Sequence, residues 1–352
     1  MLKNKIIFLF ALVCLCGVVF ADPAAAKSSG AVKVTLNFEK TVFSYDEGVP
    51  VNVSITNQSR GSVKILRWLT PFDGVKDDLF DVTVDGKAVE YIGADYKRPA
   101  PTEKDYITLK AGETFEATVD LAGFYDLAQT GFYQINYRVE TNNIFSPQSS
   151  LLDQSETLKS DIAQTYIEGR ETKIPVEAAD AVSGSTSYTG CTTSRQSSLL
   201  TARSNASTYA VNAFNYLNAG TQGARYTTWF GTYNSTRYST VRSHFSNIRS
   251  AMDTASVRFN CTCTDSAYAY VYPTQPYTIY LCNAFWGASS TGTDSKAGTL
   301  VHEMSHFNVI AATDDWAYGQ TAAKNLAQTN TTRAVDNADS HEYFAENTPA
   351  QQ

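Results

Sequence analysis

Residues His302 to His306 read HEMSH, an H-E-x-x-H motif. Because residues i and i+4 lie one above the other on a helix, His302 and His306 can direct imidazole nitrogens to one Zn²⁺ ion. Glu303 then lies beside the metal, where it can act as a general base on a water molecule. The alternative is a pair of helix-surface histidines with a glutamate between them. We favour a catalytic zinc site because the surrounding sequence predicts a buried helix.

The helix that carries the motif has both a start signal and an apolar side. Thr293, Asp294 or Ser295 can cap its N-terminus. The apolar residues at helical spacing are Ala297, Leu300, Val301, Met304 and Phe307. The motif is therefore predicted to lie against a core.

A catalytic zinc needs a third protein ligand and one open position. A histidine six residues after His306 is absent, because that position is Ala312. No acidic residue lies in 317–332, where a glutamate on a following helix would be expected. Asp315 is nine residues after His306, which leaves enough chain to turn back to the metal. Asp315 is therefore the predicted third ligand, and Asp314 is its rival.

Residues 188–352 have mainly helical patterns. Apolar residues recur on one face over 194–217, and residues 234–252 and the segments up to 347 are predicted to be helical as well. Residues 268–281 alternate, which predicts a hairpin that can offer an edge strand to an extended peptide. This part is therefore predicted to be an α+β, mainly helical domain.

Residues 22–172 follow a different pattern, in which apolar and polar residues alternate. The clearest period-two runs span 32–38, 51–55, 115–121 and 133–139. About seven or eight such strands predict an antiparallel β-sandwich of immunoglobulin-like type. No Cys or His lies between Asp22 and Gly190, so this domain cannot supply a His or Cys ligand to a metal.

The N-terminus and the segment between the two domains have their own signals. Residues 1–21 combine Lys3 and Lys5 with an apolar run and a small residue at Ala21, which predicts a cleaved signal peptide and a secreted protein. No later segment is apolar enough to span a membrane, so no membrane association is expected after cleavage. Residues 173–187 are small, polar and aperiodic, which predicts a linker that holds a processing site.

Four cysteines follow the predicted signal peptide, namely Cys191, Cys261, Cys263 and Cys282. An even number in an exported protein predicts two disulfides. Cys261 and Cys263 flank one residue in a predicted strand, so their side chains point the same way and need separate partners, Cys191 and Cys282. A cysteine metal site is the rival interpretation, although the histidine motif is the better candidate.

Composition excludes several classes of protein. Apolar residues make up 43% and charged residues 18%, which excludes a wholly disordered chain. The net charge is −7, and residues 184–352 hold ten basic and ten acidic residues, so all of this charge lies in the first 183 residues. An acidic balance of this kind argues against a nucleic-acid-binding protein.

Several segments resemble one known family. HEMSHF followed by ATDDWAYGQ is similar to the H-E-x-x-H and G-T-x-D-x-x-Y-G motifs of the aspzincin metallopeptidases, the deuterolysin family. Residues 188–352 also resemble its peptidyl-Lys metalloendopeptidases in YTGC, RYTTWFGTY, CTC, YLCNAFW, TGTDSKAGTLVHE and NADSHEYFAENTPAQ. One departure is visible, because Ala312 stands where the family has Gly.

The resemblance implies a role for each residue of the site. His302, His306 and Asp315 would hold one Zn²⁺ per catalytic domain, with Glu303 as the base and Tyr318 as the residue that stabilises the oxyanion. The zincin fold and the disulfides Cys191–Cys261 and Cys263–Cys282 are implied as well. A core tyrosine is the alternative for Tyr318.

Asp339 and Glu342 are predicted to share one face of a helix, at i and i+3. The resemblance places this pair at the pocket for the residue after the scissile bond, where it would receive Lys. An ammonium is compact, whereas a guanidinium needs a wider planar fork, so Lys should be preferred to Arg. Spacing alone is equally compatible with an acidic helix surface.

These features together predict a secreted zinc endopeptidase that is made as a zymogen and cleaves on the N-terminal side of Lys. Its partners would be protein or peptide substrates and its own propeptide, residues 22–172, as an intramolecular inhibitor. The catalytic domain would span 188–352, in a monomer. A cysteine cannot block the zinc, so inhibition would be steric or would use a carboxylate or backbone oxygen.

Two other functions fit parts of the pattern. One is a secreted binding or adhesion protein, in which an immunoglobulin-like module is joined to a non-catalytic zinc domain. The intact Glu303 argues against it, because a structural site has no use for a base. The other keeps 31–172 in the mature enzyme as a substrate-targeting domain.

Overall fold

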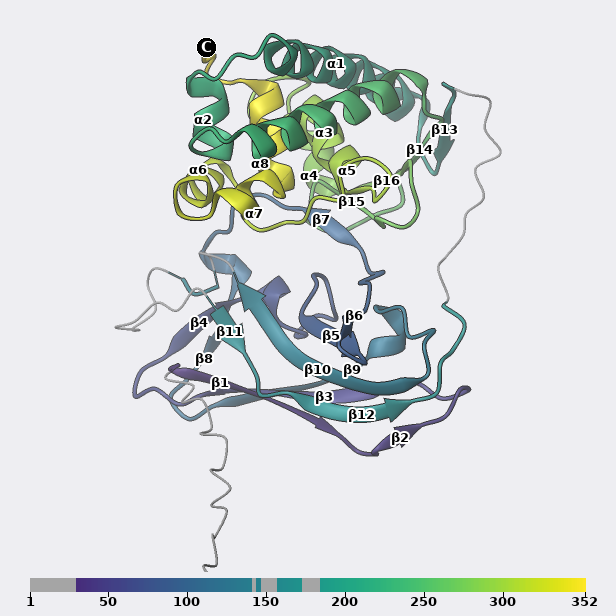
Figure 1. Ribbon diagram of the computed structural model, residues 1–352, viewed down its shortest axis with the longest axis vertical. Helices are drawn as coiled ribbons and strands as arrows, with labels where there is room; N and C mark the ends of the chain where they lie inside the picture. The colour runs from purple at the N-terminus through teal and green to yellow at the C-terminus, as the bar shows by residue number, and fades with distance from the viewer. Residues whose placement is uncertain (1–29, 141–143, 147–156, 173–183) are drawn as a thin grey trace, which may run out of the picture.

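The computed structural model describes residues 30–140, 144–146, 157–172 and 184–352. The predicted signal peptide, residues 1–21, and most of the predicted linker lie outside the described residues. Figure 1 shows a β-rich N-terminal half below a mainly helical C-terminal half. Within the described ranges no helix is long and apolar enough to cross a membrane.

The N-terminal half contains two main sheets, and its four clearest predicted strands are confirmed. One sheet has the order β1-β3-β9 and the other β2-β12-β10-β5-β6, with β11 also paired to β10 and β4 paired to β8. All of these pairs are antiparallel except β2 with β12. The strands are β1 (Val32–Phe38), β2 (Val42–Phe43), β3 (Pro50–Asn57), β4 (Val63–Leu66), β5 (Phe80–Val84), β6 (Lys87–Ala88), β8 (Tyr106–Leu109), β9 (Thr114–Asp120), β10 (Gly131–Glu140), β11 (Thr157–Lys159) and β12 (Ala163–Ile167).

Alternation along these strands explains the core of this half. In β3 every second residue is fully buried, and in β10 Tyr133, Ile135 and Tyr137 are buried while their neighbours are more exposed. Successive side chains of a strand point to opposite faces, so the buried set faces the space between the sheets. The β-rich architecture follows from this pattern, whereas the immunoglobulin-like type stays a prediction.

The C-terminal half is α+β, as predicted. Its sheet has the order β13-β14-β16-β15-β7, and its helices pack around the helix that carries the motif, α5 (Lys296–His306). The other elements are β13 (Thr186–Thr189), β14 (Val257–Asn260), β15 (Ala269–Val271), β16 (Thr278–Leu281), α1 (Thr193–Asn218), α2 (Ala224–Phe230), α3 (Ser235–Thr254), α4 (Asn283–Gly287), α6 (Gln320–Thr329), α7 (Thr331–Val335) and α8 (Ala338–Glu346).

The boundary between the halves differs from the prediction in two places. Strand β13 begins at Thr186 and pairs with β14, so the C-terminal half starts inside the predicted linker 173–187. Strand β7 (Asp95–Lys97) comes from the predicted sandwich domain but pairs antiparallel with β15. Strand β7 has three residues, which is too few to show a periodic pattern, and its partner β15 is distant in the sequence. The sequence pattern therefore could not place it.

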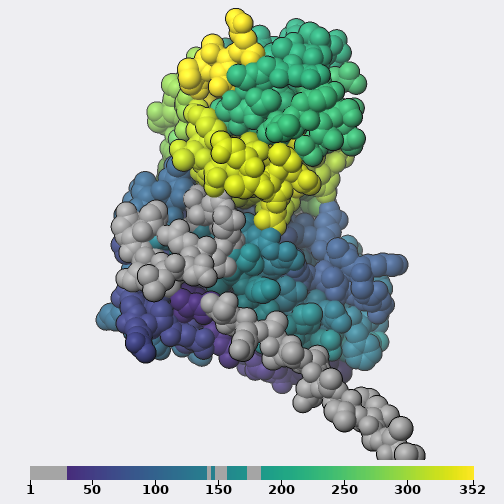
Figure 2. All heavy atoms as spheres, turned by 60° about the vertical axis from the view of Figure 1, so that its left-hand side comes forward, coloured from purple at the N-terminus to yellow at the C-terminus, as the bar shows by residue number. Residues whose placement is uncertain are grey.

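The two halves are joined by β7 and by polar contacts around it. Figure 2 shows them stacked in direct contact, with purple-to-teal atoms against yellow ones. Lys76 Nζ lies 2.5 Å from Asp265 Oδ2, and Asn308 Nδ2 donates to Glu90 Oε1 at 2.7 Å. These contacts hold β7 at the site that α5 builds.

Helix α5 is buried along its whole length, and one glycine lets α8 approach it. Ser295 caps α5 by accepting a hydrogen bond from Gly298 N at 2.9 Å. A Cβ at Gly298 would lie 2.0 Å from Glu346 Oε1 and 2.9 Å from Glu342 Oε1, both on α8. The glycine therefore leaves room beside α5 for the carboxyl groups of these two glutamates.

We predict that Gly298→Ala lowers the free energy of unfolding by about 2 kcal/mol, because the new methyl group displaces the buried Glu346 carboxylate from its hydrogen bonds with Ser295. Gly287→Ala is the matched control, since a Cβ at Gly287 meets no atom within 4 Å. Thermal and denaturant unfolding of the full chain measure both variants. Equal stability of the two would contradict the account of this helix contact.

Candidate active site

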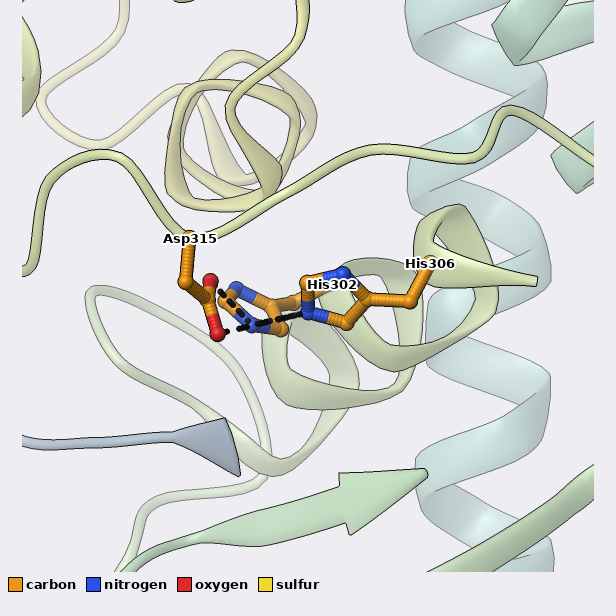
Figure 3. Close-up of side chains that lie close together, drawn as sticks. All are labelled: His302, His306 and Asp315. Carbon is orange, nitrogen blue, oxygen red and sulfur yellow. Dashed lines mark hydrogen bonds and ion pairs between the residues drawn. The ribbon is translucent and has the colours of Figure 1, made fainter. Parts of the chain in front are cut away.

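His302, His306 and Asp315 come together at the C-terminal end of α5. His302 Nε2 lies 3.1 Å from His306 Nε2 and 3.3 Å from Asp315 Oδ1, and His306 Nε2 lies 3.5 Å from Asp315 Oδ2. Figure 3 shows the two rings projecting from one helix face, with Asp315 reaching them from the segment that follows. The three predicted ligands thus form one cluster.

Each histidine has a second contact that orients its ring. His306 Nδ1 lies 2.6 Å from the carbonyl oxygen of Thr313, and His302 Nδ1 lies 3.0 Å from Asp339 Oδ1. Burial lowers the pKa of His306 to about 4, so its imidazole is neutral and can offer a lone pair. Burial opposes the charged form of His302 too, but Asp315 and other nearby carboxylates raise its pKa well above the usual value.

Glu303 lies beside the histidine cluster and is fully buried. No hydrogen bond of normal geometry reaches either of its carboxylate oxygens. Burial raises the pKa of Glu303 to about 8, whereas the nearby His302 and the backbone N–H of Lys97 lower it. A carboxylate with a raised pKa, free to receive a proton, suits a general base.

Asp339 and Glu342 form a buried pocket on α8, and a lysine of the N-terminal half occupies it. Lys97 Nζ lies 2.8 Å from Asp339 Oδ1, 2.8 Å from Glu342 Oε2 and 3.3 Å from Asp294 Oδ1. The Lys97 side chain is 0% exposed. Its ammonium also lies 5.6 Å from the ring centre of Tyr268. The acidic pair therefore faces inward, and the alternative of an acidic helix surface is wrong.

Opposite charges make this burial possible. Burial alone would lower the pKa of Lys97, but Asp339 and Glu342 raise it well above the usual value, so the side chain stays charged. The pKa of Asp339 is lowered, because Lys97 and His302 outweigh the effect of burial. Asp339 also accepts a hydrogen bond from Gly319 N at 2.6 Å. It thus links the lysine pocket to His302.

Tyr318 is buried at the contact between the halves. Its ring packs edge-on against Trp68, with centroids 5.9 Å apart, and its hydroxyl donates to Asp77 Oδ2 at 3.1 Å. Both partners belong to the N-terminal half. Burial and the nearby Asp315 carboxylate raise the pKa of Asp77 to about 8.

Asp314 stays outside the histidine cluster, although it is next to Asp315 in sequence. Its backbone N–H donates to Asp336 O at 2.8 Å and its carbonyl accepts from Ala338 N at 3.0 Å. Ala312, where the family pattern has Gly, has a φ of 49°. That left-handed conformation costs about 1–2 kcal/mol for a residue with a Cβ, which explains a preference for Gly at this turn.

Comparison with known proteins identifies the family. The family model described as lysine-specific metallo-endopeptidase, Aspzincin_M35, matches residues 215–346. An extracellular protease of Aeromonas hydrophila is 43% identical over 87% of this chain and 90% of its own length. The chain belongs to the aspzincin family of metallo-endopeptidases.

Further relatives of this aspzincin are fungal. A peptidyl-Lys metalloendopeptidase of Armillaria mellea is 39% identical over 87% of this chain and 89% of its own length. One of Pleurotus ostreatus is 54% identical over 46% of this chain and 98% of its own length. A solved zinc peptidase from Grifola frondosa is 53% identical, covers 46% of this chain and all of that chain, and has a TM-score of 0.45.

The donor set of the aspzincin fits a tetrahedral metal ion. Ligands about 2.0–2.1 Å from a tetrahedral zinc lie about 3.3–3.4 Å from one another. Here the two imidazole nitrogens are 3.1 Å apart, and they lie 3.3 and 3.5 Å from the two oxygens of Asp315. Both oxygens of Asp315 are buried without a hydrogen-bond partner, although an unpaired buried carboxylate is costly. Two imidazoles and one carboxylate are ligands that zinc accepts.

Both disulfides of the aspzincin have the pairing that the resemblance implies. Cys191 is bonded to Cys261 and Cys263 to Cys282. The first bond ties the start of α1 to the end of β14, and the second ties the loop before β15 to the end of β16. They therefore fix the ends of β14 and β16 relative to α1 and to the loop before β15.

Sequence analysis did not find two residues of the aspzincin site, Lys97 and Asp77. Both lie in a half of the chain where no motif pointed to chemistry. Lys97 is one of many lysines there, and its burial depends on acids more than 240 residues away. The excess of acidic residues in that half was the one signal that could have directed attention to Asp77.

We predict that Asp315→Ala lowers the affinity of the aspzincin for zinc by about 100-fold or more, because one of three protein ligands is lost. Asp314→Ala removes the neighbouring carboxyl group and should leave metal binding within about threefold of the natural chain. Competition titration with a zinc chelator measures both. Equal zinc affinity in the two variants would exclude Asp315 as a ligand.

Proposed function

We propose that this aspzincin is a secreted zinc endopeptidase, made as a zymogen, that cleaves peptide bonds on the N-terminal side of Lys. The burial of the Lys97 ammonium between Asp339 and Glu342 carries the proposal. The fungal relatives, which are peptidyl-Lys metalloendopeptidases, support a preference for lysine.

The chemistry of the pocket favours lysine over other side chains. Two carboxylates in a dry pocket are costly without a cation, so a bound ammonium gains strongly from both. The aliphatic part of the Lys97 side chain fills the pocket, and its three N–H groups can donate hydrogen bonds to Asp339, Glu342 and Asp294. An arginine is longer and carries a wider planar group, so it fits this compact arrangement less well.

His302, His306 and Asp315 would hold the zinc, which when bound polarises a carbonyl oxygen and increases the acidity of water. Glu303 accepts a proton from the attacking water and then transfers it to the amine nitrogen that leaves. The packing of β7, which carries Lys97, against α5, which carries Glu303, supports this role. Tyr318 donates its hydroxyl proton in a hydrogen bond to the carbonyl oxygen as negative charge develops.

Residues 22–172 act as an intramolecular inhibitor in this proposal. Lys97 fills the specificity pocket, and Asp77 accepts the hydrogen bond of Tyr318 that catalysis needs. Cleavage within 173–187 would release the domain. The Pleurotus ostreatus relative is itself about half as long as this chain, which suits an enzyme that works without the N-terminal half.

The alternative of a non-catalytic binding protein is not favoured. A structural metal site is closed by four protein ligands, whereas the cluster here has three. Glu303 is also buried beside it without a normal hydrogen bond, a costly arrangement that only a catalytic role explains.

We predict that the processed enzyme, acting on a denatured protein, releases peptides that begin mostly with Lys. Glu342→Gln should lower kcat/KM at Lys by about 30-fold or more, because the buried ammonium loses a charged partner. Asp253→Asn, an equal change of charge far from the pocket, should have no effect. Mass spectrometry of the digest reads the cleavage sites, and peptides that begin mostly with other residues would contradict the specificity.

We also predict that Lys97→Ala activates the uncut zymogen. Removal of the ammonium leaves Asp339 and Glu342 unpaired, so the N-terminal half should dock more weakly and a short Lys peptide should be hydrolysed at least about tenfold faster. Lys87→Ala, an exposed lysine on β6, is the control. Hydrolysis by uncut Lys97→Ala no faster than by the uncut natural chain would exclude Lys97 as part of the inhibitor.

A further inference from the structure

Strand β7 lies along the cleft as an extended peptide that adds to the edge of a sheet. Lys97 pairs with Ala269, Tyr96 with Tyr270 and Asp95 with Val271, all antiparallel. The carbonyl oxygen of Lys97 accepts a hydrogen bond from Tyr268 N at 2.8 Å. Without β7, strand β15 is the edge of its sheet, and an extended peptide can bind there by the same backbone hydrogen bonds.

The register of β7 relative to the catalytic residues is that of a substrate. Lys97 fills the lysine pocket, and β7 packs against α5, the helix that carries Glu303. The peptide bond between Tyr96 and Lys97 therefore lies where a bond on the N-terminal side of Lys would be cleaved. Because side chains alternate along a strand, Tyr96 and Arg98 point away from the lysine pocket, toward other parts of the C-terminal half.

We propose that this cleft has two further subsites, an aromatic one at Tyr270 for the residue before Lys and an acidic one at Asp265 for the residue after Lys. The preferred substrate is thus an aromatic residue, Lys and a basic residue in succession. The assignment rests on the proposed function, because it uses the same lysine register.

The aromatic subsite is a preformed platform. Tyr270 stacks on Tyr280 with ring centroids 4.5 Å apart and planes 3° from parallel, and Tyr272 packs edge-on against both at 5.8 Å. The Tyr96 ring lies 4.9 Å from that of Tyr270. Once β7 leaves, the face of Tyr270 is open to another ring. An aromatic side chain gains from such a contact beyond the area that it buries.

The acidic subsite is fixed in place, and among the described residues its cations come from the N-terminal half. Asp265 Oδ2 lies 2.5 Å from Lys76 Nζ, and Oδ1 lies 3.6 Å from Arg98 Nη1. Its Oδ1 also accepts a hydrogen bond from Ala267 N at 3.0 Å, in the loop that the Cys263–Cys282 disulfide anchors. When the N-terminal half leaves, Asp265 stays in position without either cation. A basic side chain that follows Lys can then replace Arg98.

Four peptides that differ only around one Lys test both subsites. The residue before Lys is Tyr or Leu, and the residue after it is Arg or Gln. The full-length chain is expressed and processed, and kcat/KM is measured for each peptide. We expect Tyr to exceed Leu by about three- to tenfold and Arg to exceed Gln by about three- to fivefold.

Two variants assign each preference to its residue. Tyr270→Leu should reduce the Tyr-to-Leu ratio to about one, and Asp265→Asn should do the same to the Arg-to-Gln ratio. Each ratio compares two peptides on one enzyme, so partial loss of folded protein cancels. Tyr233→Leu, at a half-exposed tyrosine outside the cleft, is the control and should keep both ratios.

The outcomes separate this inference from the proposed function. Cleavage before Lys at equal rates in all four peptides overturns the two subsites and leaves the lysine specificity standing. Ratios that persist in Tyr270→Leu and Asp265→Asn overturn the assignment of these residues. No cleavage before Lys in any peptide overturns the proposed function, and the subsites with it.

Discussion

One buried ammonium determines how the two halves of this chain meet. Lys97 of the N-terminal half contacts Asp339 and Glu342 of α8 at 2.8 Å, and all three side chains are shielded from water. Separating them would leave two carboxylates buried without a cation, which is far more costly than losing a surface ion pair. The strand that carries Lys97 is held in the cleft by this requirement, and the contacts of Tyr318 and Asp265 with the N-terminal half lie around it.

The same pair of acids links specificity to the metal cluster. Asp339 contacts Lys97 with the oxygen that also faces His302 Nδ1, while its other oxygen accepts from Gly319 N. A cation in the pocket therefore influences the charge and orientation of His302. This coupling explains why two carboxylates are buried so close to the catalytic residues.

Much of this arrangement could be predicted from the sequence. The H-E-x-x-H spacing determines the relation of His302 to His306 on a helix, and the alternation in 32–139 predicts the β-rich half. The prediction of Asp315 as the third ligand required a count of the residues after His306 and the absence of other acidic residues within reach. These features depend on local periodicity or short spacing, which a sequence displays directly.

The rest depends on contacts between residues far apart in the chain. Lys97 and Asp339 are 242 residues apart, and nothing near Lys97 distinguishes it from other lysines. Asp77 accepts its hydrogen bond from Tyr318 across a similar separation in the sequence. Strand β7 has three residues, too few to show a period, and its pairing with β15 depends on the tertiary fold. Long-range complementarity of charge and shape is invisible to a pattern search.

In the proposed zymogen, the ammonium of Lys97 holds β7 in the cleft as a substrate would be held. Inhibition of the processed enzyme by a peptide of residues 92–101, with a reduced Tyr96–Lys97 bond that cannot be hydrolysed, tests it most directly. The account predicts competitive inhibition that weakens by about 30-fold or more when norleucine, which lacks the charge, replaces Lys97. Equal inhibition by the two peptides would contradict the account.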